Sequence, residues 1–290
     1  MSTRLGVIHR PDFAPDGLRR VAAAVETAGV DELWLWEDCF QQGGIAQVAV
    51  ALAATQRLSV GVGLVPAPLR NVAATAMEFA TLEAMFPGRV QLAVGHGVQS
   101  WMHQAGAAVA SPMALLREYV TALRRLLAGE RVTVEGRYVR LSEVELLFPP
   151  QRRLPILIGG TGPKTLRLAG EIADGVVIDS RYSTRTVLEA LGHVAAGRDE
   201  ADGREPFRTV QFVACAPGVD ATRILAEEAA RQEVAAGDQF GVGGSAEGIA
   251  LGLRPYRGAG VDAIALQPLG SQDEMLTFIT AAGEVRRLLH

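Results

Sequence analysis

The sequence predicts an α/β fold, a closed (β/α)8 barrel. Short apolar runs typical of strands alternate with helix-like runs along the whole chain, which is the pattern of parallel βα units. Eight such units fit within 290 residues, a length suited to this barrel. No interior linker or low-complexity segment interrupts the series, so we expect one domain over residues 1–290. An open doubly wound sheet is the competing fold, but eight unbroken units favour closure.

The first half of the chain contains four βα units. Strand patterns cover residues 5–9, 32–36, 58–65 and 90–94, and helix patterns cover residues 16–28, 45–55, 72–85 and 112–128. Leu18, Val21, Ala22 and Val25 recur at helical spacing, which places them on one face of the first helix. Gly29 follows that helix and is typical of a helix end.

The apolar period changes after residue 130. The segment RVTVEGRYVRLSEVELLF alternates apolar and polar residues around Glu135 and Gly136, which predicts a β-hairpin inserted before the fifth strand. The βα series then resumes. Strands are expected at 156–158, 175–179, 210–214 and 262–267, and helices at 165–169, 184–196, 221–235, 246–256 and 272–289.

Bulk composition excludes several classes of partner. A net charge of −4 argues against a nucleic-acid or membrane-surface partner. The N-terminus has no signal-peptide pattern, and no run approaches the roughly 18 apolar residues of a membrane span. Two cysteines favour a reducing cytoplasm, and the five histidines show no metal-binding spacing, so no metal is expected.

A glycine-rich turn follows the fifth strand. Gly159, Gly160 and Gly162 allow a tight backbone turn with accessible N–H groups, and Pro163 suits the first position of a helix. The positive end of the helix dipole would then favour an anion on residues 160–162. An ordinary strand-to-helix turn is the alternative.

The active site of a closed barrel lies at the carboxyl ends of its strands. Seven polar or reactive residues follow predicted strands, namely His9, Asp38, Cys39, His96, Gln99, Trp101 and Asp179. Asp38 could instead cap a helix, and a lone cysteine such as Cys39 is more often inert. His96 lies between two glycines, which favours a role in the site. Trp34 and Trp36 share one strand face and are expected in the barrel core.

Four sequence blocks, taken together, resemble the bacterial luciferase-like superfamily. They are ETAGVDELWLWED, the segment 60–97, the segment 115–141, and the glycine turn with Ala-Asp-Gly at 173–175. The resemblance covers nearly the whole chain. It is nearest to the branch of F420- and flavin-dependent oxidoreductases that includes methylenetetrahydromethanopterin reductase.

This resemblance implies a (β/α)8 barrel, often dimeric, that binds a flat tricyclic cofactor at the strand ends. The phosphate-bearing tail would lie on Gly159, Gly160, Thr161 and Gly162. The ring would lie near Gly95, His96 and Gly97, and against a non-prolyl cis peptide at Leu64–Val65, with Val65 behind it. Asp38, Cys39 and His96 would polarise the ring or the substrate, and His9, Gln99, Trp101 and Asp179 would form the substrate pocket.

The implied function is a cytoplasmic, homodimeric oxidoreductase that moves a hydride between coenzyme F420 and an organic substrate. An FMN-dependent monooxygenase on the same barrel is the first alternative, and a barrel that binds a ligand without turnover is the second. Two departures from the family pattern motivate the second alternative. Many relatives have histidine where this chain has Cys39, and an acidic or bulky residue where it has Val98.

Overall fold

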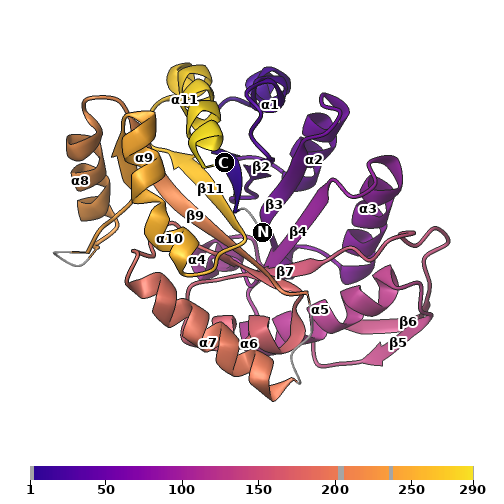
Figure 1. Ribbon diagram of the computed structural model, residues 1–290. Coiled ribbons are helices and arrows are strands. Elements are labelled where there is room, and N and C mark those ends of the chain that lie inside the picture. Colours follow the sequence, from indigo (N-terminus) through magenta and orange to yellow (C-terminus); the bar gives the residue numbers. More distant parts are fainter. Residues whose placement is uncertain (1–2, 202–205, 235–237, 290) are drawn as a thin grey trace.

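The computed structural model describes residues 3–201, 206–234 and 238–289. Eight parallel strands form the barrel in the order β1, β2, β3, β4, β7, β8, β9 and β11 (Figure 1). Their bounds are Arg4–His9, Glu32–Leu35, Ser59–Pro66, Val90–Gly95, Ile156–Gly159, Gly175–Ile178, Arg208–Pro217 and Ala263–Pro268. The ring is closed because β8 pairs with β9, β9 with β11, and β11 with β1. The predicted (β/α)8 barrel is therefore confirmed.

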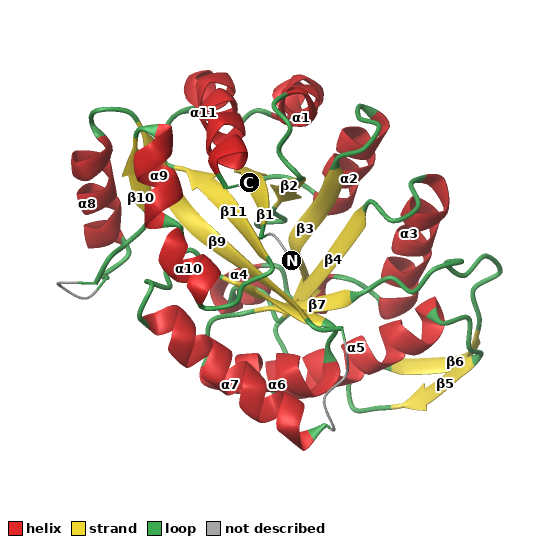
Figure 2. Ribbon diagram, in the orientation of Figure 1, coloured by secondary structure: helices red, strands yellow, loops and turns green. Residues whose placement is uncertain are grey.

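Helices surround the strands on the outside (Figure 2). The main ones are α1 Leu18–Thr27, α2 Gly44–Ala53, α3 Val72–Met85, α5 Pro112–Leu127, α6 Pro163–Ile172, α7 Thr186–Glu200, α8 Ala221–Arg231 and α11 Met275–Leu288. Short 3-10 turns precede α1, α3 and α11, at Pro15–Gly17, Ala67–Leu69 and Gln272–Glu274. The predicted hairpin is confirmed as β5 Val132–Glu135 and β6 Arg140–Val144, which lie outside the barrel.

Some element boundaries differ from the sequence prediction. The helix expected at 246–256 is two helices, α9 Ala246–Gly252 and α10 Arg254–Gly258, because Pro255 starts a new helix at its first turn. The expected helix 221–235 ends at Arg231, and residue 235 lies outside the described residues. Two short elements were not expected, α4 Gln99–Gln104 and β10 Val242–Gly244, which pairs with the end of β9.

The apolar core has two parts. The larger part packs the outward faces of the strands against the helices. The smaller part fills the barrel and consists of Ile8, Trp34, Ala93, Leu157, Val177, Val210, Phe212, Ala263 and Ala265. Trp34 is fully buried there, as predicted, and Gly61 leaves room for it, since a Cβ on Gly61 would lie 2.7 Å from the indole ring. Because these side chains fill the barrel, a ligand site within the ring of strands is confined to its two ends.

Candidate active site

A cavity of about 470 Å³ lies at the carboxyl ends of five strands. Most of the predicted site residues line it: Asp38 after β2, Leu64 in β3, His96, Gly97, Gln99 and Trp101 after β4, Gly159, Gly160 and Thr161 after β7, and Asp179 after β8. The structure thus brings together residues that are up to 141 positions apart, as Asp38 and Asp179 are. The cavity lies at the end of the barrel where (β/α)8 enzymes carry their sites.

The floor of the cavity is apolar. Leu64, Phe212 and Trp36 form it, and the Trp36 and Phe212 rings stack with their centroids 6.0 Å apart. Gly95 and Gly159 make space for Leu64, because a Cβ on either would lie 2.5 Å or 2.7 Å from Leu64 Cδ2. These two glycines therefore admit a neighbouring side chain into the floor. An apolar floor of this kind suits the face of a flat ring.

The predicted cis peptide lies one residue earlier than expected. It joins Gly63 to Leu64, where the pairing of β3 with β4 shifts register between Val62 and Val65. Leu64 packs against the barrel interior, whereas Val65 is fully buried among the outward-facing core residues. The prediction that Val65 backs the ring is therefore wrong, because its side chain points to the other side of the strand. Leu64 occupies that position.

Asp38 is the most perturbed acid of the cavity. Burial raises the pKa of its carboxyl from 3.8 to about 6, and the negative charges of Asp179 and Asp12 add to the shift. Asp179 comes from β8, which lies opposite β2 in the ring of strands. Asp179 Oδ1 accepts hydrogen bonds from the backbone and the side chain of Arg181, both at 2.9 Å. Asp38 can therefore hold or release a proton near neutral pH.

His96 is held at the rim by its neighbours. Its Nδ1 lies 3.0 Å from the carbonyl oxygen of Gly97, and its Nε2 lies 3.4 Å from Thr165 Oγ1 in α6. Gln99 Nε2 donates to the carbonyl oxygens of His96 and Gly97. Gly97 has a φ of +69°, a conformation that glycine adopts without strain. The imidazole thus has a defined position beside the turn that leads into α6.

The glycine turn contributes backbone N–H groups and one positively charged side chain, that of Lys164. A Cβ on Gly160 would lie 2.4 Å from Thr165 Cγ2, whereas a Cβ on Gly162 would meet nothing within 4 Å. Gly162 caps α6, and no side chain of the described residues makes a capping hydrogen bond there. Lys164, the chain's single lysine, is exposed in the first turn. A phosphate group would find free N–H groups and a positive charge here.

Gly160 lines the cavity and also packs against the start of α6. The contact with Thr165 makes Gly160 a packing position between β7 and α6, because Thr165 is buried. A larger residue would displace the helix as well as any ligand.

Cys39 and His9 lie outside this cavity, and Val65, Gly95 and Gly162 do not line it either. Cys39 lines a neighbouring hollow of about 360 Å³ with Phe40 and Arg70, and a second cis peptide joins Cys39 to Phe40. Burial and the charges of Glu37 and Asp38 raise the pKa of the Cys39 thiol, which lowers its reactivity. His9 is buried against the edge of Phe13, and burial lowers its pKa to about 4. The structure therefore does not bring either residue into the cavity.

Eight of the described lining residues were not among the predicted site residues, and two of them, Trp36 and Phe212, form the cavity floor. Trp36 was expected in the barrel core, but it lies on the cavity floor, and its buried Nε1 has no hydrogen-bond partner among the described residues. Phe212 occupies an inward position of β9 that alternation along the strand could have revealed. Arg181 follows Asp179 by two residues and lines the same cavity.

The family comparison agrees with this geometry. The model of the luciferase-like monooxygenase family matches residues 2–280. The chain belongs to this family. The predicted resemblance is thereby confirmed, and members of the luciferase-like family are F420- or flavin-dependent oxidoreductases and monooxygenases.

Two relatives show the similarity in sequence. The chain is 31% identical over 185 residues to 5,10-methylenetetrahydromethanopterin reductase from Methanolobus tindarius, which covers 64% of this chain and 56% of that protein. It is 36% identical over 213 residues to the F420-dependent glucose-6-phosphate dehydrogenase of Nakamurella multipartita, covering 66% and 62%. The matches span less than two thirds of each relative's length.

A solved structure shares the whole fold. An F420-dependent secondary alcohol dehydrogenase, in complex with an F420-acetone adduct, superimposes with a TM-score of 0.89 over 100% of both chains at 20% identity. Identity at this level shows a common luciferase-like barrel and no more.

The cavity fits the cofactor class of the family. Its volume lies within the roughly 300–1,000 Å³ of small-molecule sites. Its apolar floor suits a flat ring, the unpartnered Trp36 Nε1 offers a hydrogen bond, and the start of α6 suits a phosphate. Among the described residues, no cluster of histidine, cysteine and acidic side chains could hold a metal ion. No described helix is long and apolar enough to cross a membrane.

Proposed function

We propose that this protein is an oxidoreductase that transfers a hydride between coenzyme F420 and a small organic substrate. The observation that carries the proposal is Asp38, a carboxyl group with a pKa near 6 at the edge of an apolar-floored cavity. Such a group can exchange a proton with a substrate at physiological pH. The choice of F420 is supported by the F420-dependent relative that is 36% identical.

Each part of the cavity has a separate task. Leu64, Trp36 and Phe212 would support the cofactor ring, and the turn from Gly159 to Gly162, with Lys164, would hold the phosphate of its tail. When bound, F420 supplies or accepts the hydride, so the chemistry is largely that of the cofactor.

The polar rim would handle the substrate. Asp38 would give a proton to the substrate oxygen or nitrogen during reduction and take it back during oxidation. His96 and Asp179 would orient the substrate, while Gln99 and Trp101 would close the cavity from the side of α4 and exclude water.

The second candidate is an FMN-dependent monooxygenase. The family model that matches this chain carries the monooxygenase name, and backbone N–H groups at α6 would bind the phosphate of FMN as well as that of F420. In that case reduced FMN would activate oxygen.

Fluorescence titration separates the two cofactors. The purified protein should bind F420 more tightly than FMN, with a dissociation constant at or below about 10 μM. Tight binding of FMN without binding of F420 would exclude the first candidate in favour of the second. Binding of either cofactor without turnover would favour a ligand-binding barrel.

The single lysine offers a test that does not depend on activity. An amine-reactive acylating reagent can modify Lys164 and the N-terminal amine, and peptide mass spectrometry distinguishes them. Bound cofactor should slow acylation of Lys164 by about tenfold or more, because the phosphate would cover it, with the N-terminal amine as the internal control. Equal rates with and without cofactor would place the tail elsewhere.

We also propose that the protein forms a homodimer through α2 and α3. The residues that these helices expose are mostly small or apolar: Ala46, Val50, Ala53, Ala74, Met77, Ala84 and Met85. A helix that is apolar on all sides is normally covered on all sides. A second copy with the same face would cover it symmetrically. The free thiols of Cys39 and Cys215 support the expected cytoplasmic location.

A further inference from the structure

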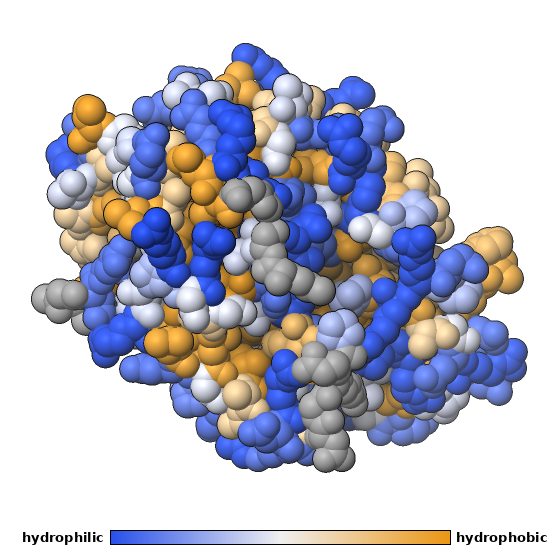
Figure 3. All heavy atoms as spheres, in the orientation of Figure 1, coloured by the Kyte–Doolittle hydropathy of each residue, from blue (hydrophilic) through white to orange (hydrophobic). Residues whose placement is uncertain are grey.

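A second cavity lies at the opposite end of the barrel from the candidate active site. It has a volume of about 190 Å³ and is bordered by residues at the starts of strands, among them Arg4 of β1, Ser59 of β3, Val90 of β4 and Arg208 of β9. Figure 1 views the barrel from this end, where β1 begins at Arg4. Figure 3 shows hydrophilic residues on both sides of the centre of this face.

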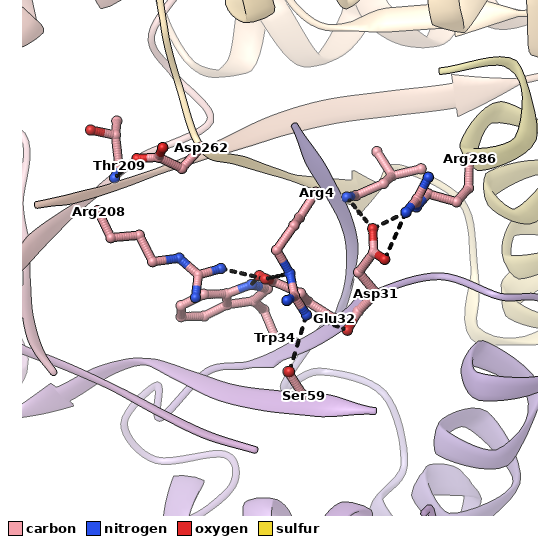
Figure 4. A network of polar contacts seen from close by, with 10 residues as sticks. Arg4, Asp31, Glu32, Trp34, Ser59, Arg208, Thr209, Asp262 and Arg286 are labelled. Atoms are coloured by element: carbon pink, nitrogen blue, oxygen red, sulfur yellow. Dashed lines mark hydrogen bonds and ion pairs between the residues drawn. The ribbon is translucent and has the colours of Figure 1, made fainter. Parts of the chain in front are cut away.

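The described lining is rich in guanidinium groups. Arg4, Arg152, Arg153 and Arg208 all border the cavity, and Glu83 is the single acidic residue among the described lining residues. Arg4 and Arg208 both bind the fully buried Glu32 (Figure 4). These two arginines are therefore fixed in place by a carboxylate that lies behind them.

The other two arginines differ in their partners. Arg153 pairs with the buried Asp174, which also binds Arg124 at 2.8 Å. Arg152 is exposed at the rim and has no hydrogen bond or ion pair to any described residue. Its guanidinium group borders the cavity and forms no ion pair with Glu83, although its positive charge acts to lower the pKa of that carboxyl group.

Two buried polar side chains in the lining have unused hydrogen-bonding atoms. Gln91 occupies an inward position of β4, two residues before Ala93 of the barrel interior, and is 7% exposed. Neither its amide nitrogen nor its amide oxygen has a partner among the described residues. Glu83 is 5% exposed; its Oε1 accepts from the backbone of Gly88 at 2.7 Å, and its Oε2 is unpartnered. Buried polar groups normally have hydrogen-bond partners. A bound ligand could supply the partners that Gln91 and Glu83 Oε2 do not have among the described residues.

We propose that this cavity binds a small hydroxylated oxyanion, a phosphate or carboxylate compound with at least one hydroxyl group. Arg152 and Arg153 would hold the anionic oxygens, for which planar guanidinium groups are well suited. The Gln91 amide would donate to one ligand oxygen and accept from a hydroxyl group. Glu83 Oε2 would accept from a second hydroxyl group, which explains an acidic residue among the arginines. The small volume limits the ligand to a few carbon atoms.

The network beside the cavity provides a spectroscopic readout. Trp34 Nε1 donates to Glu32 Oε2 at 3.0 Å, and Glu32 in turn holds Arg4 and Arg208 (Figure 4). Because Arg4 and Arg208 also border the cavity, an anion bound there would change the electric field at the Trp34 indole. Trp34 also packs edge-on against Phe212, a residue of the active-site floor, with centroids 5.6 Å apart.

Calorimetric titration with four probes tests the proposal. Glycerate and glycerol phosphate carry an oxyanion with hydroxyl groups, inorganic phosphate carries the oxyanion alone, and glycerol carries the hydroxyl groups alone. At constant ionic strength, glycerate or glycerol phosphate should bind with a dissociation constant of about 1 mM or lower, phosphate more weakly, and glycerol not at all. Whichever of the first two binds more tightly identifies the carboxylate or the phosphate as the natural group.

Two variants and one control locate the binding. Arg152→Gln should weaken the affinity by about tenfold or more, since it removes a charge-assisted contact. Gln91→Leu should abolish binding yet raise the unfolding temperature, because it replaces an unpartnered amide with an apolar group. Arg20→Gln, an exposed arginine on α1, should change neither. The protein's tryptophan fluorescence should respond to the anion, and the response should be lost in Trp34→Phe while calorimetric binding remains.

Three results would overturn this assignment. They are no saturable binding of any anion below about 10 mM, equal affinity in the wild type and both cavity variants, or glycerol binding as tightly as the anions. The last would mean a neutral site. All are independent of the proposed activity, because none requires F420, FMN or turnover.

Discussion

At the scale of single residues, Asp38 makes the sharpest prediction about pH. Its pKa near 6 means that it is protonated below that pH and charged above it. Reduction of a substrate requires a proton, so kcat/KM for reduction should fall about tenfold per pH unit above pH 6. Oxidation in the reverse direction should instead fall below pH 6. Both pH dependences of kcat/KM should disappear in Asp38→Asn. If either persists in this variant, another group is responsible for it.

The same carboxyl should influence folding stability. The pKa of Asp38 is raised by folding from 3.8 to about 6, so its favourable contribution is complete below pH 3.8 and is lost as the pH rises through 6. Asp38→Asn should therefore stabilise the protein at pH 8 by up to about 2 kcal/mol and change little at pH 4. Urea unfolding at both pH values measures this difference. Asp199→Asn, on the exposed face of α7, serves as the control and should show no such pH dependence.

The two glycines around Thr161 should respond differently to the same substitution. Gly160→Ala places a Cβ 2.4 Å from Thr165 Cγ2 and should cost about 1–3 kcal/mol of stability. Gly162→Ala meets open space, has an ordinary φ of −86°, and should change stability by less than about 0.5 kcal/mol. Thermal unfolding of the pair checks this. Equal costs would show that conformational freedom, and not packing, explains Gly160.

At the scale of elements, α2 and α3 form the surface that we expect a second copy of the chain to cover. Met77 is 60% exposed in the middle of α3, amid small and apolar neighbours. Met77→Glu would bring two charges together at a symmetric interface and should shift a dimer to monomers, as light scattering after gel filtration would detect. Leu188→Glu, a comparably exposed position of α7, should leave the oligomeric state unchanged. A monomeric wild type would refute the dimer.

At the scale of the whole molecule, Glu32 helps to join the barrel across three strands. It lies in β2, is fully buried, and binds Arg4 of β1 and Arg208 of β9 as well as Trp34 (Figure 4). Glu32→Ala would leave two arginines without their partner and should cost about 3–5 kcal/mol in urea unfolding. Glu227→Ala, which breaks the exposed pair with Arg223, should cost less than about 1 kcal/mol. Similar costs for both would mean that solvent screens the buried pair.

The sequence by itself determined the fold class and the order of the elements. Strand and helix periods are local, and each apolar run records which face of its own element is covered. The helix expected at 72–85 is α3 to the residue, because Asn71 caps it and accepts from the backbone of Ala73. The predicted strand ends were accurate enough to place Asp38, His96 and Asp179 in one site, because parallel strands of a barrel end at the same edge.

Only the tertiary structure decided which side chains point into the cavity. Leu64 and Val65 are adjacent, equally apolar residues, and the register shift in β3 sends one inward and the other outward. Gly160 lines the cavity, but its close contact with Thr165, five residues later, could not be read from the sequence. Cys39 and His9 lie beside the site and not in it. The physical reason is that periodicity describes single elements, whereas orientation and close contact depend on elements distant in the sequence.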